Sequence, residues 1–186
     1  MTLTPTRRRF TVHDYQQMGR AGVLTEDDRV ELIDGEIIQM SPIGPPHTGT
    51  VARFTKRFVE RFGDVALVFV QNPIRLGEHD EPEPDLALLR PRPDFYTTAH
   101  PTPADIFLVV EVADTSLEYD RRTKLPLYAR HNIPEVWVVD LNANRILVSR
   151  DPTPSGYRTT WTVGRGDRIA PLDFPERELE GVDLLG

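Results

Sequence analysis

Three charged residues in the middle of the chain have the types and the placement that metal-assisted hydrolysis of a phosphate ester requires. Asp85 opens a β-prone run directly after a proline, and Glu111 follows the apolar run Ile106 to Val110. Lys124 lies on the helical stretch that comes next. Two carboxylates on adjacent strands, together with the main-chain carbonyl of Val112, would suit Mg²⁺ or Mn²⁺, which bind carboxylates, water and phosphate oxygens. A lysine near them would reduce the repulsion between the carboxylates and offset charge that develops on the phosphoryl group.

The stretch from Ile106 to Asp140 must position two of these residues. Its first apolar run is long enough for a strand buried on both faces, and a carboxylate that ends such a strand needs a partner. The helical spacing of Lys124, Leu125 and Tyr128 predicts a helix, and a β-prone run, 135–140, follows it. Strand, helix and strand in this order predict a βαβ unit with neighbouring parallel strands.

A hairpin is predicted upstream. The run 29–40 alternates on both sides of Asp34-Gly35, which is the strongest short hairpin signal. Glu31 lies on the first strand of this hairpin.

A long helix is predicted to start near His47 and to end at Gly63. Phe54, Phe58 and Phe62 recur at helical spacing, which indicates a face that packs on a sheet.

The remaining patterns complete a mixed sheet with helices on its faces. Thr11 and Asp14 have capping-box spacing, which predicts a short N-terminal helix. Further strands are predicted at 65–71, 74–76, 85–89, 145–149 and 157–163. The acidic run 78–83 is predicted to form a solvated loop. We therefore expect an α/β (α+β) fold, with a central mixed β-sheet flanked by helices and an N-terminal hairpin. Residues 1–9 are expected to form a flexible arm and residues 10–186 a single domain.

Composition narrows the classes of function. The chain of 186 residues has no cysteine, which excludes a disulfide framework, a thiolate metal site and a cysteine nucleophile. Its formal net charge of -7 repels polyanions, which weighs against a passive nucleic-acid binder and less against an enzyme whose metal ion offsets its own acids. No apolar run approaches membrane-spanning length, and we expect a cytoplasmic protein.

Several short motifs follow one another in a specific order. They are ELIDGE, PPH at a helix start, PEPD, LVVEV and the segment D-x-x-x-K-L-x-L-Y-A-R-x-x-I-P-E-V-W-V-V-D. Each motif is weak alone, but their order and spacing resemble the Uma family of putative restriction endonucleases, in the PD-(D/E)XK nuclease superfamily. The resemblance extends from about Phe10 into the C-terminal tail. It implies a restriction-endonuclease-like core and a metal-dependent endonuclease that hydrolyses DNA phosphodiester bonds.

The resemblance also implies roles for individual residues. Asp85 and Glu111 would be catalytic and would bind the metal with the Val112 carbonyl. The superfamily pattern places a lysine two residues after the second acid, where this chain has alanine. As in several relatives, the lysine is displaced onto the following helix, which singles out Lys124. Pro126 departs from this pattern because proline kinks a helix, and it leaves the direction of the lysine open.

Three further positions follow from the resemblance. It points to Glu31 and His47 as additional catalytic residues. A carboxylate on the hairpin could reach the metal or a water molecule, and His47, near a helix N-terminus, could contact a phosphate. Tyr128 lies where related nucleases keep a site residue, but its spacing with Leu125 and Ala129 is that of a packed face, and we predict a core residue.

Each candidate also has an ordinary structural explanation. Asp85 could open a solvated strand, and Glu111 could mark a strand end that is already in solvent. Lys124 could form a surface pair with Asp120 that contributes only about 0.3–0.5 kcal/mol. Glu31 could be an outward-facing strand residue, and a polar residue such as His47 is ordinary at a helix start.

Two other functions stay open. The fold could be a non-catalytic DNA- or protein-binding module that retains the acids, or a hydrolase of small phosphorylated substrates. A basic stripe on the surface would favour a nuclease that binds DNA. Its members would be Arg53, Lys56, Arg57, Arg61, Arg121, Arg122 and Arg130. A homodimer is expected because two-fold pairs are the commonest assemblies and suit the cutting of both strands of a duplex.

Overall fold

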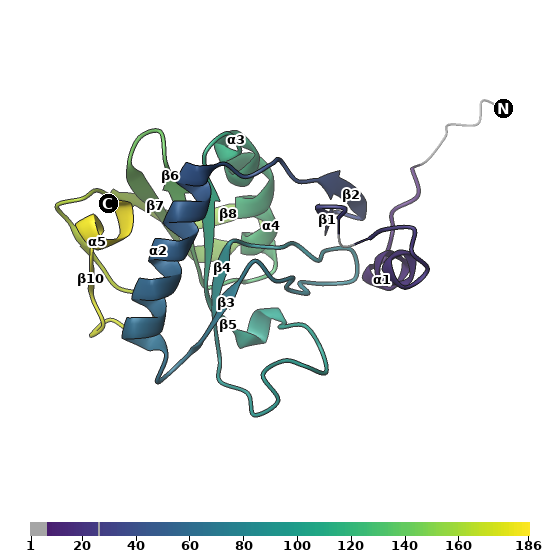
Figure 1. Cartoon of the computed structure of the whole chain (residues 1–186), viewed down its shortest axis with the longest axis horizontal. Helices are drawn as coiled ribbons and strands as arrows, with labels where there is room; N and C mark the ends of the chain where they lie inside the picture. Colours follow the sequence, from purple (N-terminus) through teal and green to yellow (C-terminus); the bar gives the residue numbers. More distant parts are fainter. Residues whose placement is uncertain (1–6, 26) are drawn as a thin grey trace.

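The computed structural model describes residues 7–25 and 27–186, so most of the predicted arm at residues 1–9 lies outside the described residues. A six-stranded mixed sheet forms the centre of the molecule (Figure 1). Its strands, in spatial order, are β3 (Leu67–Val70), β4 (Leu86–Leu89), β5 (Ile106–Ala113), β6 (Glu135–Asp140), β7 (Arg145–Thr153) and β8 (Gly156–Val163). The predicted central mixed sheet is therefore confirmed.

The β5 strand is buried along its whole length because apolar layers cover both of its sides. It pairs in parallel with β6, with Glu111 opposite Val138, and antiparallel with β4, with Val110 opposite Leu86. The other neighbouring strands in this sheet are antiparallel. The parallel pair confirms the predicted βαβ unit, and the end of β5 brings Glu111 beside the start of β4.

Helices cover both faces of the sheet. On one face, α2 (Pro45–Phe62) packs the predicted phenylalanine stripe against Trp137 and alternate residues of the central strands. The short helix α5 (Gly181–Leu185) lies beside α2 in Figure 1. On the opposite face, α4 (Leu125–Arg130) buries Leu127 and Tyr128 among residues of β4, β5 and β6. Between α2 and α4, the polar residues at the ends of β4 and β5 meet.

The N-terminal elements pack beside the α4 face (Figure 1). Helix α1 (Val12–Arg20) begins with the predicted capping box, and β1 (Val30–Ile33) pairs with β2 (Glu36–Gln39) across Asp34 and Gly35. Both turn residues have positive φ, as a two-residue hairpin turn requires. A main-chain bridge from Leu32 to Glu81 ties the hairpin to the loop before β4.

Two sequence predictions are wrong in this region. Residues 74–76 do not form a strand: Ile74 and Leu76 are buried, but their N–H groups bond to carbonyls of the same loop. The acidic run 78–83 is not a solvated loop, because Asp80 and Glu81 are buried. Asp80 accepts a hydrogen bond from the Asp34 N–H and another from His131, partners too distant in sequence for a local pattern to show.

The helix after β5 is divided. A short α3 (Leu117–Tyr119) leads into a π-helical turn, η2 (Asp120–Lys124), and α4 follows with Pro126 in its first turn. A proline ring clashes with the carbonyl four residues earlier in a regular α-helix, and the wider π turn relieves that clash. The irregularity turns both ends of η2 inward, because Asp120 and Lys124 are buried whereas Arg121 and Arg122 are exposed.

The C-terminal segment adds a two-stranded sheet, β9 (Arg168–Ile169) with β10 (Leu179–Glu180), outside the central sheet. A 3-10 turn, η1 (Pro103–Asp105), precedes β5. Within the described ranges, no helix combines the length and apolar character needed to cross a bilayer.

Candidate active site

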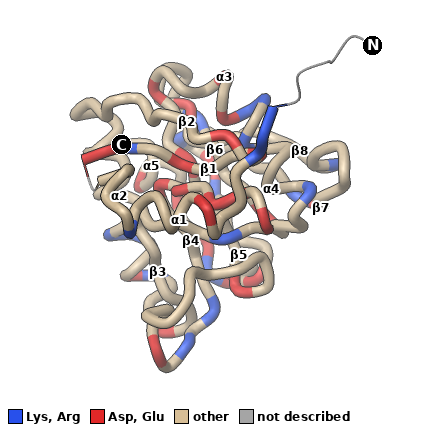
Figure 2. The backbone as a smooth tube through the Cα atoms, turned by 90° about the vertical axis from the view of Figure 1, so that its right-hand side faces the viewer, with Lys and Arg blue, Asp and Glu red and all other residues tan. Residues whose placement is uncertain are grey.

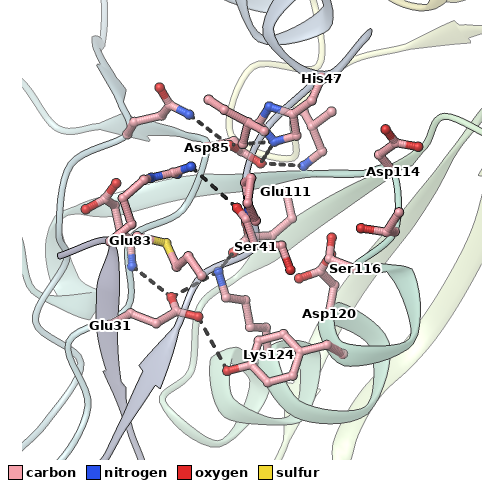
Figure 3. Close-up of a pocket in the computed structure, with 18 of the residues that line it drawn as sticks. Glu31, Ser41, His47, Glu83, Asp85, Glu111, Asp114, Ser116, Asp120 and Lys124 are labelled. Carbon is pink, nitrogen blue, oxygen red and sulfur yellow. Dashed lines mark hydrogen bonds and ion pairs between the residues drawn. The ribbon is translucent and has the colours of Figure 1, made fainter. Parts of the chain in front are cut away.

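A pocket of about 540 Å³ opens where β4 begins and β5 ends. All five side chains that the sequence singled out line it, and so does Val112 (Figure 3). They come from five different parts of the fold: Glu31 from β1, His47 from α2, Asp85 from the residue before β4, Glu111 from β5 and Lys124 from η2. The segment between β2 and α2 and the start of α3 form other walls of the pocket.

Asp85 is held from several directions. Its Oδ2 accepts a hydrogen bond from the Val112 main-chain N–H at 2.8 Å, and its Oδ1 accepts a longer one from Gln71 at 3.4 Å. The His47 Nε2 lies 3.1 Å from the same carboxylate. These contacts fix the carboxylate at the edge of β5, where the ladder between β4 and β5 has ended.

Glu111 is buried at the end of β5 and points toward α4. The Tyr128 hydroxyl donates a hydrogen bond to its Oε1 at 2.5 Å. The prediction that Tyr128 belongs to the core is therefore correct for its ring, but its hydroxyl also orients a site carboxylate. The alternative that Glu111 is already in solvent is wrong, because the residue is only 3% exposed.

Lys124 bridges two acids. Its Nζ lies 3.1 Å from the Glu111 Oε1 and 3.1 Å from the Glu31 Oε2. A surface pair with Asp120 does not describe this lysine, because both side chains are buried. Burial alone would lower the pKa of Lys124, but the carboxylates of Glu111, Glu31 and Asp120 outweigh it and hold the pKa well above its usual value, so the lysine carries a positive charge.

Glu31 belongs to the centre rather than to the outer surface of the hairpin, since it is only 2% exposed. Besides Lys124, its carboxylate accepts hydrogen bonds from the Glu83 main-chain N–H at 3.2 Å and from the Tyr119 hydroxyl at 3.4 Å (Figure 3). The hairpin therefore contributes the second of the two carboxylates that hold the Lys124 ammonium.

His47 lines the pocket from the first turn of α2. Its Nε2 faces Asp85, and its Nδ1 is buried without a hydrogen-bond partner in the described part of the chain. Because a carboxylate only accepts, the imidazole donates from Nε2. This arrangement orients Asp85 in the way that outer-shell partners orient metal ligands.

Negative charge exceeds positive charge around the pocket. Burial raises the pKa of Glu111, Lys124 opposes that shift, and the carboxylates of Asp120, Asp85 and Glu31 add to it. Several buried carboxylates beside one ammonium are costly unless protons or a further cation offset them. The electrostatics of the pocket therefore favour a bound cation.

The donor set fits a hard divalent ion. Tyr128 and Lys124 both contact Oε1 of Glu111, which leaves further lone pairs on that carboxylate. The N–H and carbonyl of one strand residue point to the same edge, and those of the next residue point to the opposite edge. The Val112 N–H donates to Asp85, and the Ala113 carbonyl accepts from the Leu141 N–H, which follows β6. The Val112 carbonyl therefore lies on the same edge as Asp85.

The predicted ligand set would contain two carboxylates and a carbonyl rather than three side chains. In residues 7–25 and 27–186 there is no group of three His, Cys, Asp or Glu side chains arranged to hold a metal. Mg²⁺ does not require one, because one or two carboxylates with water and phosphate oxygens suffice.

Comparisons with known proteins identify the family of the chain. A family model described as "Putative restriction endonuclease", Uma2, matches residues 12–182. The chain belongs to the Uma2 family. The sequence resemblance is thereby confirmed, and membership supports a nuclease.

A solved structure shares the fold of this Uma2 chain. It is a putative nuclease belonging to DUF820 from Anabaena variabilis, at 16% sequence identity and a TM-score of 0.74. The similarity covers 95% of this chain and 97% of the other. No curated protein matches the chain in sequence.

The sequence did not identify every polar residue of the Uma2 pocket. Asp120 is buried on its wall and accepts a hydrogen bond from the Ser116 hydroxyl at 2.7 Å. Burial raises the pKa of Asp120, although Lys124 and Ser116 oppose the shift. The four-residue spacing of Asp120 and Lys124 was a usable signal, since it places both on one side of a helix. Arg29 and Tyr119 also line the pocket, and no local pattern marked them.

The basic residues proposed as one stripe are divided between two faces. Arg53 donates to the Leu184 carbonyl, and Arg57 pairs with Asp183, so these two α2 members face α5. Arg130 pairs with Asp34 on the opposite side of the sheet. In Figure 2, acidic positions gather around β1 and α1 near the centre of the view. The surface of this Uma2 chain therefore has no single basic track formed by those residues.

Proposed function

We propose that this Uma2 chain is a metal-dependent endonuclease that hydrolyses DNA phosphodiester bonds. One observation carries the proposal. Asp85 and Glu111 line the same pocket, and the Lys124 ammonium lies against Glu111. Two acids can hold a divalent cation, and a lysine beside them can offset charge that develops on a phosphate during hydrolysis.

Asp85, Glu111 and the Val112 carbonyl would hold Mg²⁺ or Mn²⁺. When bound, such an ion lowers the pKa of a coordinated water and offsets negative charge on the phosphate. Asp85 keeps its orientation through His47 and the Val112 N–H, and Glu111 keeps its orientation through Tyr128. The protein thus supplies preformed oxygen ligands with no need to reorganise.

Lys124 contributes a fixed positive charge. Its ammonium donates toward the attacking water and stabilises the phosphoryl oxygens as their charge increases. Glu31 keeps the ammonium in place from the side of the hairpin. This gives Glu31 and His47 positioning roles, since each acts through another residue of the site.

DNA is the substrate that the family description favours. We propose a homodimer for the cutting of duplex DNA, since a two-fold pair presents one such pocket to each strand. Cleavage of the two strands would then depend on protein concentration in the range of the dimer equilibrium.

The proposal is tested by cleavage of supercoiled and linear DNA with Mg²⁺, Mn²⁺ or EDTA. We expect the wild type to cut only with metal, and Asp85→Asn and Glu111→Gln to be inactive. Asp173→Asn is the matched control. Asp173 is exposed and does not line the pocket, so this substitution removes the same charge at a distance from the site. Equal cleavage by wild type and both site variants would contradict the proposal.

A hydrolase of small phosphorylated substrates is the second candidate, favoured by the size and acidity of the pocket. About 540 Å³ lies in the range of small-molecule sites. Hydrolysis of bis(p-nitrophenyl) phosphate without DNA cleavage would select this function. Inertness toward both substrates, without Mn²⁺ binding, would select the non-catalytic module.

A further inference from the structure

The pocket has one cation besides the catalytic lysine. Acidic residues outnumber basic ones in the described lining, and they are Glu31, Glu83, Asp85, Glu111, Asp114 and Asp120. The basic side chains of the same lining are Lys124 and Arg29. A polyanionic backbone that approaches this pocket therefore meets repulsion wherever no cation faces it.

Lys124 cannot serve as the outer contact for the backbone. It is only 5% exposed, and its ammonium is bounded by Glu31 and Glu111. Arg29 is partly exposed, at the entrance to the hairpin. In the ranges that the structure describes, its guanidinium has a single, long hydrogen bond, from Nη1 to the Ser41 carbonyl at 3.4 Å. A guanidinium has five N–H donors, so most of its capacity remains for a ligand.

The main chain of Arg29 is held by hydrogen bonds, although most donors of its side chain are unused. Its carbonyl accepts hydrogen bonds from the Met40 N–H at 2.8 Å and from the Gln39 side chain at 2.9 Å, which extends the hairpin by one pair. The charge of Arg29 also lowers the pKa of Glu83, against the larger effect of burial, so the guanidinium acts on the acidic wall. A planar guanidinium held at a pocket rim is suited to bidentate contact with a phosphate.

We infer that Arg29 is the phosphate-anchoring residue of this site, which binds a nucleic-acid backbone phosphate next to the one that is cleaved. This inference rests on the proposed function. Arg29 acts in substrate binding, whereas the metal ligands and Lys124 act on the scissile phosphate. Its loss therefore weakens binding uniformly across DNA sequences and raises KM more than it lowers kcat.

The test compares Arg29→Ala and Arg29→Lys with Arg158→Ala. The control removes the same charge from an exposed position of β8 that does not line the pocket. Binding of a short fluorescent DNA duplex is measured by anisotropy with Ca²⁺, over a series of KCl concentrations, and cleavage is measured with Mg²⁺. Unfolding by urea shows that each variant is folded.

We expect Arg29→Ala to bind DNA about tenfold or more weakly at low salt, because a charge-assisted hydrogen bond is lost. The slope of log K against log salt should become shallower by about 0.7–0.9, the value for one phosphate contact. Arg29→Lys should keep the slope and lose part of the affinity, since lysine keeps the charge without the planar donor pair.

The outcomes separate the inference from the function on which it rests. If the wild type binds and cuts DNA and Arg29→Ala matches Arg158→Ala in affinity and salt slope, Arg29 is not the anchor and the proposed function stands. If the wild type neither binds nor cuts DNA, the proposed function fails and the anchor fails with it.

Discussion

The ammonium of Lys124 lies 3.1 Å from a carboxylate oxygen of Glu111, although the two residues belong to different elements, η2 and β5. The same ammonium also lies 3.1 Å from Glu31. Lys124 is the last residue of the π turn and is buried. A lysine on the helix thus meets the second acid without occupying the strand position two residues beyond it, which is Ala113.

The buried Lys124 should stabilise the fold as well as act in the site. Lys124→Met leaves Glu111 and Glu31 buried without a counter-charge, and the loss of one partner of a buried pair costs about 3–5 kcal/mol. We expect a decrease of that size in the free energy of unfolding in urea. In a Glu31→Gln background, the same substitution should cost clearly less, because one of the two acids is already neutral. Equal costs in both backgrounds would contradict the bridge.

The hydroxyl of Tyr128, which donates to a carboxylate, should stabilise the protein more than a hydroxyl that donates to a neutral carbonyl. Tyr128→Phe removes the hydrogen bond to the Glu111 carboxylate, and we expect a loss of about 1.5–3 kcal/mol. Tyr157→Phe is the matched control, because its hydroxyl donates to the Ile133 carbonyl, and its loss should cost about 0.5–1.5 kcal/mol. Urea unfolding of both variants gives the comparison, and a larger loss for Tyr157→Phe would refute it.

His47 should affect the metal through Asp85. His47→Ala removes the donor that orients the carboxylate, and outer-shell partners of this kind change metal affinity by about 10–100-fold. We expect Mn²⁺ titration by calorimetry to show that decrease, with His13→Ala unchanged because His13 is exposed on α1. An unchanged Mn²⁺ affinity in His47→Ala would remove the positioning role.

Asp80 should make stability depend on pH. Burial raises its pKa, but the hydrogen bonds from His131 and the Asp34 N–H and the charge of Arg130 outweigh burial and hold the pKa below 3.8. The folded carboxylate therefore binds its proton less readily than the unfolded one. Its contribution is present above pH 3.8 and is lost as the pH falls through the lower folded value.

The variant Asp80→Asn tests this dependence. At pH 7 we expect Asp80→Asn to unfold at a lower temperature than the wild type. The difference in Tm should shrink as the pH approaches 3. A difference that is constant over this range would show that the charge of Asp80 does not contribute.

The sequence was a good guide where local chemistry decides the structure. The Asp34-Gly35 turn, the phenylalanine stripe of α2 and the run from Ile106 to Glu111 each have a pattern with one structural solution, and all three were confirmed. Family resemblance added the fold around them, which the Uma2 match and the shared fold also show.

The remaining features depend on contacts between distant segments. Asp80 is buried where it accepts hydrogen bonds from His131 and from the Asp34 N–H of the hairpin. Glu31 is buried where it pairs with Lys124, a residue far from it in the sequence. Pro126 indicated a break in the helix. The irregularity is a π turn over Asp120–Lys124, directly before the α4 helix that contains Pro126, and Asp120 is buried within it. No period or propensity in a single sequence specifies such pairings.

A crystal of the protein grown with Mn²⁺ tests the central claim most directly, because anomalous scattering locates the ion independently of activity. We predict one or two peaks in the pocket, with oxygens of Asp85, Glu111 and the Val112 carbonyl as ligands. Saturating Mn²⁺ with no anomalous peak near Asp85 and Glu111 would contradict the account.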